Sequence, residues 1–354
     1  MINVCVVNPN YYRSSGVTVA IRRIYESLPD ADISQYFVDC GHGSEEEDTS
    51  WIPQNRLSTF GLMTVNPAAF VRACAAFLRW LKKNQIQVVH VHHRRLAVIL
   101  NCLKIFRKYK LIYTGNLTYP YEFWFWLCSP RIATGISHSV IENLKRTTRA
   151  KQLHLISNGC DFPADCAPVD VSRVSATAIC IARLDKVKGH EILLDAWRTL
   201  LDRGRQCRLL LVGEGDLRPT LERQAKDLGI DHAVEFRGFQ RDVIPQIEQA
   251  LFAILPSRVE GQGIVSIEAA ARGRPSLVTD VDGSRDCVPP RHALPNLVQF
   301  GDSAGLADAL ETWFVRPDLV VAEGRLFFDY LKSSSSTETV GNKYRVLYSQ
   351  VASR

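Results

Sequence analysis

The sequence predicts an α/β protein built from two doubly wound domains, each with a parallel sheet covered by helices. Two observations predict this fold class. Short apolar runs rich in β-branched residues alternate with segments of helical periodicity along the chain, and such alternation is typical of parallel sheets. The length of 354 residues corresponds to about two domains.

The first domain is expected over residues 1–165, with a C-terminal helix at about 335–354 packing back on it. Apolar runs flanked by polar turns predict its strands, and apolar residues at helical spacing predict its helices. The strands are predicted at 2–7, 87–91, 111–114, 132–135 and 153–156, and two of the helices at 17–28 and 68–81.

A turn at residues 157–161, followed by Pro163 and Pro168, predicts the linker to a second domain over 170–332. That domain begins with a strand predicted at 178–182, which a helix with one apolar stripe follows. Low-complexity runs at 45–48 and 333–336 are expected to be exposed loops. Four further strands are predicted near 208–212, 233–236, 251–255 and 275–279.

Composition indicates a cytoplasmic protein. The sequence has no apolar run of about eighteen residues that could span a membrane, and its start reads as a strand, without the features of a signal peptide. The ten cysteines are scattered without a C-x-x-C pair, which favours reduced thiols over disulfides or a zinc site. Four of them lie in apolar runs and are expected in the core: Cys5, Cys74, Cys102 and Cys180.

Positive charge is concentrated in the first half of the chain. Residues 1–160 hold 19 Lys and Arg against 10 Asp and Glu, whereas the remainder holds 24 against 27. Much of the excess lies in a basic segment at 104–110 and in an amphipathic segment at 70–83. The second has Trp80 and basic residues at its C-terminal end. This pattern suits an anionic membrane surface, and a solvated basic face is the alternative. Nucleic-acid binding is not expected, because no reading module accompanies the charge.

Three motifs follow predicted strands of the second domain, where doubly wound sheets bind ligands. The first contains Arg183 and Lys188, next to Gly189. Two fixed cations there can hold a diphosphate and offset the charge that builds on a leaving phosphate. Two solvated surface cations in a loop are the alternative.

Glycines mark the second motif, in which Gly213 and Gly215 follow the apolar run at 209–212. Gly238 stands after the next predicted strand and is included among the candidate donor-binding residues.

The third motif places Glu260 and Glu268 on either side of a glycine loop. Glycines let a backbone approach a phosphate, and the first amides of the helix that follows would point at it. A solvated loop acid and a helix N-terminal acid stabilised by the dipole are the alternatives for the two carboxylates. The loop and the helix start are Gly261, Gln262, Gly263, Ile264 and Val265.

At these separations the three motifs resemble the donor-binding half of the retaining family-four glycosyltransferases. Their GT-B fold has two Rossmann-like domains facing across a cleft. The resemblance is close over residues 180–315 and holds in outline over 1–160. It implies that Glu260 lies at the donor sugar and that Glu268 accepts hydrogen bonds from the ribose hydroxyls, for which a carboxylate is suited. Gln262 is a departure, because family members commonly have an aromatic residue there.

The first domain resembles the acceptor half of the same family. Gly16 matches the glycine-containing loop that faces the cleft, and His92 matches the family histidine near the reacting sugar. His90 lies on the same strand face, but no nearby carboxylate completes a metal site, so no metal is expected. The aromatic segment at 119–126 is expected to pack in the core, with stacking on an acceptor sugar or contact with lipid as alternatives.

The resemblance therefore implies a retaining hexosyltransferase that needs neither metal nor cofactor. It would move a hexosyl or N-acetylhexosaminyl unit from a nucleotide diphosphate sugar to a glycan, expected to be lipid-linked and to belong to bacterial polysaccharide or lipopolysaccharide synthesis. The expected location is the cytoplasm, at the inner face of the cell membrane. A sugar-nucleotide epimerase of the same architecture and a non-catalytic nucleotide-sugar-binding protein are the alternatives. An NAD-dependent oxidoreductase ranks low, because neither half opens with G-x-G-x-x-G.

Overall fold

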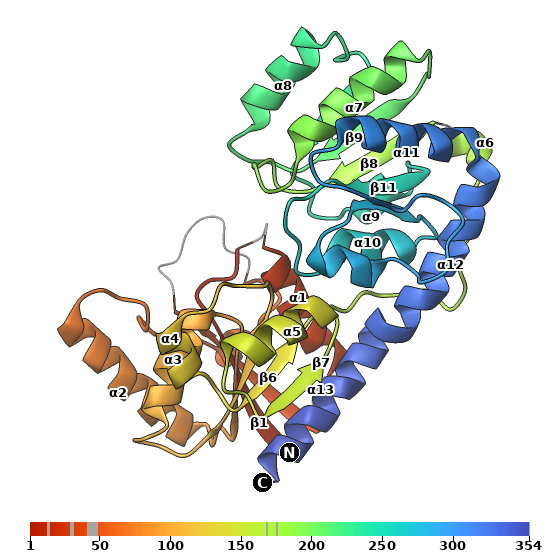
Figure 1. Ribbon diagram of the computed structural model, residues 1–354. Coiled ribbons are helices and arrows are strands. Elements are labelled where there is room, and N and C mark those ends of the chain that lie inside the picture. Colours follow the sequence, from red (N-terminus) through yellow and green to blue (C-terminus); the bar gives the residue numbers. More distant parts are fainter. Residues whose placement is uncertain (13–14, 29–31, 41–48, 168, 175, 354) are drawn as a thin grey trace. The chain divides into compact units, whose positions relative to one another are not determined.

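The computed structural model describes the chain except for residues 13–14, 29–31, 41–48, 168, 175 and 354. It divides into two compact units, one of residues 1–159 with 337–354 and one of residues 160–336. Pro168 and the low-complexity run at 45–48 lie outside the described residues. Each unit holds one parallel sheet with helices on both faces (Figure 1), so the predicted fold class is confirmed.

The first unit contains a seven-stranded sheet in the order β3-β2-β1-β4-β5-β6-β7. Its strands are β1 (Ile2–Asn8), β2 (Ile33–Asp39), β3 (Leu57–Thr59), β4 (Val88–Val91), β5 (Lys110–Gly115), β6 (Ile132–Gly135) and β7 (Gln152–Leu155). Its helices are α1 (Gly16–Ser27), α2 (Pro67–Lys83), α3 (Arg94–Leu103), α4 (Phe123–Cys128), α5 (His138–Thr147) and α13 (Thr337–Ala352), with the short η1 (Gln54–Arg56).

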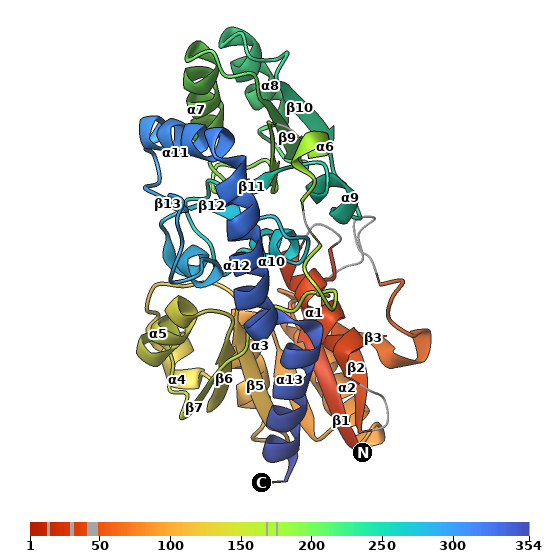
Figure 2. The same cartoon turned by 90° about the vertical axis from the view of Figure 1, so that its right-hand side faces the viewer.

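Two apolar layers cover the faces of this sheet. One is formed with residues of α2, α3 and α5, and the other with residues of α1 and α13. The C-terminal helix α13 thus packs on the first sheet, where Val340, Tyr344 and Tyr348 lie against Val4 and Val88 in one buried cluster. Figure 2 shows α13 beside β1 and α1 from a second direction.

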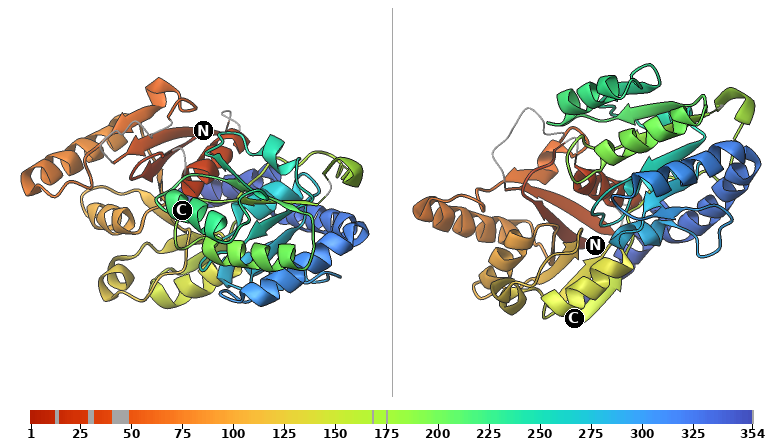
Figure 3. Two further views of the ribbon diagram at one scale, coloured as in Figure 1. Left: turned by 90° about the horizontal axis from the view of Figure 1, so that it is seen from above. Right: turned by 45° about the horizontal axis from the view of Figure 1, so that its top comes forward.

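The second unit contains a six-stranded sheet in the order β10-β9-β8-β11-β12-β13. Its strands are β8 (Thr177–Ile181), β9 (Arg208–Val212), β10 (Val234–Gly238), β11 (Phe252–Leu255), β12 (Ser276–Thr279) and β13 (Leu297–Val298). Its helices are α6 (Val171–Val174), α7 (His190–Asp202), α8 (Arg218–Asp227), α9 (Ile244–Ile247), α10 (Ile264–Ala270), α11 (Ser303–Val315) and α12 (Pro317–Ser335), with η2 (Asp282–Cys287). Figure 3 shows both sheets with their covering helices from two further directions.

Two expectations are wrong. The serine run at 333–336 is not an exposed loop, because α12 continues through Ser335, whose side chain is fully buried. Cys102 lies in an apolar run but is exposed, whereas Cys5, Cys74 and Cys180 are buried as expected. Cys102 lies on α3, which has one buried and one solvent-facing side, and an apolar run on a helix therefore does not bury every member.

Candidate active site

The loop after β8 is packed closely against the loop after β11. Gly189 precedes α7 with a φ of 68°, and a Cβ there would lie 2.1 Å from the carbonyl oxygen of Pro256. Only glycine fits this approach. The amide of Arg258 donates to the carbonyl oxygen of Val187 over 2.7 Å. The topology, which makes β8 and β11 neighbours, therefore brings the first and third sequence motifs together.

Lys188 and Glu260 form an ion pair between these two loops. The distance from Lys188 Nζ to Glu260 Oε1 is 2.5 Å, and the side chains are 24% and 10% exposed. Ser257 Oγ donates to the same carboxylate oxygen over 2.8 Å. Both bonds go to Oε1, so Oε2 can accept a hydrogen bond from a ligand hydroxyl. The carboxylate is thus held at one oxygen and available at the other.

Arg183 lies at the same end of the sheet with more freedom. Its side chain is 66% exposed, and its Nε donates to Asp185 Oδ2 over 2.6 Å. The other oxygen of Asp185 accepts from the amide of Val187 over 3.0 Å. Asp185 thereby holds the loop and one edge of the guanidinium, and the other edge of the guanidinium still has donors for an anion.

The glycines of the second motif permit close contacts within the protein. A Cβ on Gly213 would lie 2.0 Å from the carbonyl oxygen of Ala182, and one on Gly215 would lie 2.4 Å from that of Leu184. Gly238 has a φ of 70°, and its carbonyl oxygen accepts from the amide of Gly213 over 2.9 Å. Packing accounts for these three glycines, and their contact with a ligand stays a prediction.

The glycine loop of the third motif leads directly into α10. Gly263 is the N-cap residue, and Ile264 and Val265 begin the helix. The Gln262 and Glu268 side chains are both buried, with 7% exposed. Sequence reasoning missed Ser266, whose fully buried hydroxyl makes no hydrogen bond to any described residue. An unpaired buried hydroxyl beside a glycine loop indicates a place where a ligand can supply the partner.

Gly283 is a second residue that sequence reasoning left without a role. A Cβ on Gly283 would lie 2.2 Å from the carbonyl oxygen of Gly261 and 2.6 Å from that of Glu260. Gly283 belongs to η2, which follows β12, the strand next to β11. Because glycine has no Cβ, the backbone that carries Glu260 can pack directly against residue 283.

In the first unit, His92 follows β4 at the carboxyl end of the strand. Its side chain is 7% exposed, and neither ring nitrogen has a hydrogen-bond partner among the residues that the structure describes. Burial lowers the pKa of His92 to about 3, so the imidazole is neutral at ordinary pH. A neutral imidazole with two unpaired nitrogens can donate to one ligand group and accept from another.

His90 is structural. Its Nδ1 lies 2.7 Å from the Tyr348 hydroxyl and its Nε2 lies 2.6 Å from the Thr114 hydroxyl. The Thr114 hydroxyl in turn bonds to that of Thr134 over 2.6 Å. His90 thus ties the C-terminal helix to the sheet, and its ring centre lies 4.3 Å from that of His92.

The remaining acceptor-half features are only partly as expected. Gly16 is the exposed first residue of α1, and the two residues before Ser15 lie outside the described chain. Core packing holds for Phe125, which is buried, but the expectation is wrong for Trp124, which is 72% exposed. Tyr121, which precedes α4, and Phe123, its first residue, are also more than half exposed, so this segment buries Phe125 and turns other aromatic side chains outward.

The basic end of α2 is exposed, but its tryptophan is not free. The Trp80 ring packs on the rings of Tyr36, Phe60 and Phe77, with centroid distances of 5.9, 5.7 and 6.3 Å. This helix end therefore presents charge to its surroundings while its aromatic ring belongs to the core. The exposed basic side chains are Arg79, Lys82 and Lys83.

Within the described part of the chain, no group of three histidine, cysteine or carboxylate side chains is arranged to hold a metal ion. None of the helices in the described ranges combines the length and the apolar character needed to cross a bilayer.

Comparisons with known proteins match both units. A family model described as Glycosyltransferase Family 4 matches residues 14–162, and one described as Glycosyl transferases group 1 matches residues 175–314. Alpha-D-kanosaminyltransferase of Streptomyces kanamyceticus is 32% identical over 149 residues, covering 39% of this chain and 36% of that protein. The GDP-mannose-dependent alpha-(1-6)-phosphatidylinositol monomannoside mannosyltransferase of Mycobacterium tuberculosis is 30% identical over 178 residues, covering 47% and 46%. The chain spans less than half the length of these curated relatives.

Among solved structures, Alr3699/HepE of Anabaena in complex with UDP matches with a TM-score of 0.83 at 16% identity, covering 99% of this chain and all of that one. At this identity the likeness shows the fold alone. Each of the two units therefore has the fold of the corresponding domain in GT-B proteins.

Proposed function

We propose that this chain, a glycosyltransferase of the family 4 type by the models that match its two domains, transfers a hexosyl or N-acetylhexosaminyl unit with retention of configuration. The donor would be a nucleotide diphosphate sugar and the acceptor a hydroxyl group of a glycan. The observation that carries the proposal is the Lys188–Glu260 ion pair beside the glycine loop. It combines a cation for a diphosphate with a carboxylate for a sugar at the carboxyl ends of β8 and β11.

The two cations have distinct parts in the proposed reaction. Lys188 has three ammonium donors, so it can hold Glu260 and still contact a phosphate oxygen. Arg183 can present the free edge of its guanidinium to the diphosphate while Asp185 holds the other edge. As the bond between sugar and phosphate breaks, negative charge grows on the phosphate, and both cations stabilise it. These fixed charges are the basis for proposing that the reaction requires no divalent metal.

The carboxylates and the histidine would position the sugar. Glu260 would accept from a donor-sugar hydroxyl through Oε2, and Glu268 from the ribose. The hydroxyl of Ser266 would meet the phosphate near the glycine loop. In the acceptor half, the neutral His92 would hydrogen-bond a hydroxyl of the reacting sugar. Retention follows from the family resemblance, in which the departing phosphate helps to deprotonate the acceptor on the same face.

Relatives support a nucleotide diphosphate donor without fixing the base. The name of the mycobacterial relative specifies GDP-mannose, whereas the structural neighbour from Anabaena was solved with UDP and with UDP-glucose. We therefore propose the donor class and test the base by experiment.

For the acceptor we propose a lipid-linked glycan reached at an anionic membrane. The mycobacterial relative acts, by its name, on a phosphatidylinositol mannoside. The exposed aromatic side chains near α4 and the exposed basic end of α2 are suited to such a surface. Cosedimentation with anionic vesicles should fall steeply with salt, and changing Arg79, Lys82 and Lys83 to Glu should abolish it. Equal recovery with neutral vesicles would remove the membrane from the proposal.

The proposed roles of the cations are tested by substitution. Lys188→Ala and Arg183→Ala should each lower turnover by about a hundredfold or more, the effect of losing one preorganised charge contact. Nucleotide diphosphate release from the donor, with an acceptor extract present, is the readout. Arg205→Ala is the matched control, because Arg205 is an exposed arginine of the same unit that pairs with Glu311. Folded variants with activity within a few-fold of the native chain would refute the roles.

A further inference from the structure

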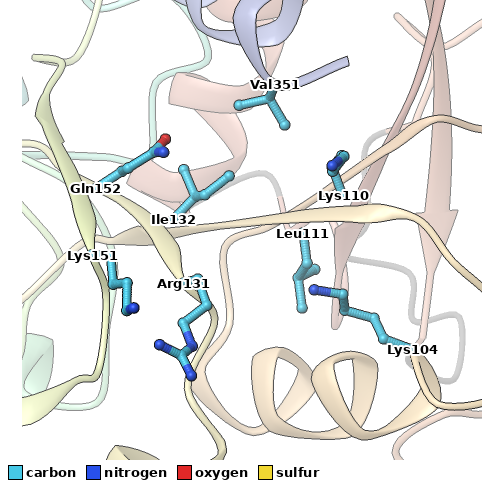
Figure 4. A pocket seen from close by; sticks show the side chains of 8 residues that line it. All are labelled: Lys104, Lys110, Leu111, Arg131, Ile132, Lys151, Gln152 and Val351. Carbon is cyan, nitrogen blue, oxygen red and sulfur yellow. The ribbon is translucent and has the colours of Figure 1, made fainter. Parts of the chain in front are cut away.

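A second cationic site lies in the first unit. It lies at the amino ends of the strands, whereas His92 follows the carboxyl end of β4. Here a pocket of about 260 Å³ is open to solvent. Figure 4 shows the four cationic side chains with the other residues that line this pocket. The cations are Lys104, Lys110, Arg131 and Lys151, and Leu111, Ile132, Gln152 and Val351 complete the lining.

The topology explains why the cations lie close together, with Lys110 on the face of the sheet that α13 covers and Arg131 and Lys151 on the other face. Lys110 is the first residue of β5, and Arg131 and Lys151 stand directly before β6 and β7. These three strands are parallel neighbours, so their amino ends lie at the same end of the sheet. Neighbouring strands there are about 4.8 Å apart. Ile132 pairs with Gln152 in the β6–β7 register, which places Arg131 beside Lys151. Lys104, at the end of α3, adds the fourth charge.

These charges are not neutralised within the described part of the chain. Among the described residues, no carboxylate lies within 4.0 Å of any of the four cationic groups, and no acidic residue lines the pocket. Burial lowers the pKa of Lys104, and the nearby Lys110 and Arg131 lower it further. Like charges side by side on neighbouring strands are destabilising, so an anion in this pocket would remove a repulsion that the protein otherwise carries.

We propose that this pocket binds a phosphate-type anion carrying at least two negative charges. Arg131 offers a planar pair of donors for phosphate oxygens, and the lysines act as point charges around it. The apolar lining residues belong to both faces of the sheet, Leu111 to one and Ile132 and Val351 to the other. The same chemistry can come from a free diphosphate or from the phosphate headgroup of a lipid. This site is independent of the proposed donor site, which lies in the other unit.

Inorganic diphosphate is the first probe, with isothermal titration calorimetry and thermal unfolding as readouts. Because diphosphate can also occupy the proposed donor site, the titration uses Lys188→Ala as background. In that background we expect binding and a raised Tm, since a ligand that binds only the native state stabilises it. Adding Arg131→Gln with Lys151→Gln should weaken binding by about tenfold or more, the effect of losing charged hydrogen bonds.

The matched control adds Arg146→Gln with Lys343→Gln to the same background. It removes one exposed arginine and one exposed lysine of the same unit that neither line the pocket nor belong to the basic end of α2, and it should leave diphosphate binding unchanged. Equal weakening in both pairs of variants would show general charge attraction and overturn the site.

Vesicles of phosphatidylcholine with phosphatidic acid are the second probe. Binding of these vesicles that depends on Arg131 and Lys151, with weak binding of free diphosphate, would assign the site to a lipid headgroup. Binding of diphosphate alone would assign it to a soluble anion. If neither probe distinguishes the Arg131→Gln, Lys151→Gln variant from the control, the proposal is wrong.

Discussion

Replacing Gly283 by alanine tests whether activity depends on the position of the loop that carries Glu260. The added Cβ would lie 2.2 Å from the Gly261 carbonyl oxygen and 2.6 Å from that of Glu260. Since carbon–oxygen contacts rarely close below about 3.3 Å, the loop must retreat by roughly 1 Å. A shift of that size in a positioned group costs on the order of a hundredfold in rate. We therefore expect a large loss of kcat, although residue 283 carries no reactive group.

The expected loss should exceed the effect on folding. Overpacking of this kind costs about 1–3 kcal/mol of unfolding free energy, so Tm should fall by several degrees while the variant remains folded at assay temperature. Release of nucleotide diphosphate is measured well below Tm. Gly61→Ala is the control, because no described residue beyond its chain neighbours has an atom within 4 Å of its added Cβ. A Gly283→Ala variant with the kcat and KM of the native chain would refute this reasoning.

Three further predictions concern stability, pH and metal. Tyr348→Phe leaves His90 Nδ1 without its 2.7 Å partner and should cost about 1–3 kcal/mol in chemical denaturation; an unchanged midpoint would contradict the network. Because burial lowers the pKa of His92 from 6.5 to about 3, the unfolded chain binds an extra proton between those values, and stability should fall as pH drops through that window. His92→Gln should reduce the slope of unfolding free energy against pH by up to about 1.4 kcal/mol per pH unit. An identical slope in the variant would show that another group causes the pH dependence. Turnover should persist in excess EDTA, and its loss with recovery on adding manganese would show that a metal is required.

Most strands that the sequence predicted contain apolar, β-branched runs. The prediction omitted the short strands β3 and β13, and also β2, whose sequence contains Gln35 in a fully buried position. The Gln35 side-chain nitrogen donates to the carbonyl oxygen of Tyr25 over 3.3 Å, so tertiary packing buries a side chain whose polarity argues against a core strand in the sequence. The serine run at the end of α12 is similar, because Ser335 is buried although its type favours loops.

The candidate site shows the same division between local and long-range information. Glycine and charge spacing identified Lys188 and Glu260 as separate features, but only the adjacency of β8 and β11 pairs them. Ser257 and Gly283 contact the loop that carries Glu260, but no sequence motif assigned them a role. A contact between residues 261 and 283 depends on strand order, which hydrophobic periodicity does not encode.

The most direct test of the central claim measures which nucleotide sugar the second domain binds. The native chain is heated with UDP-glucose, UDP-N-acetylglucosamine, GDP-mannose or buffer, and Tm is recorded with each. Ligand at a hundredfold its Kd stabilises a native protein by about 2.7 kcal/mol, so at least one donor should raise Tm by several degrees. The same donor should lose most of this effect with Lys188→Ala and with Glu268→Ala, but not with Arg205→Ala. A Tm that no nucleotide sugar shifts, or a shift that survives both site substitutions, would contradict the account.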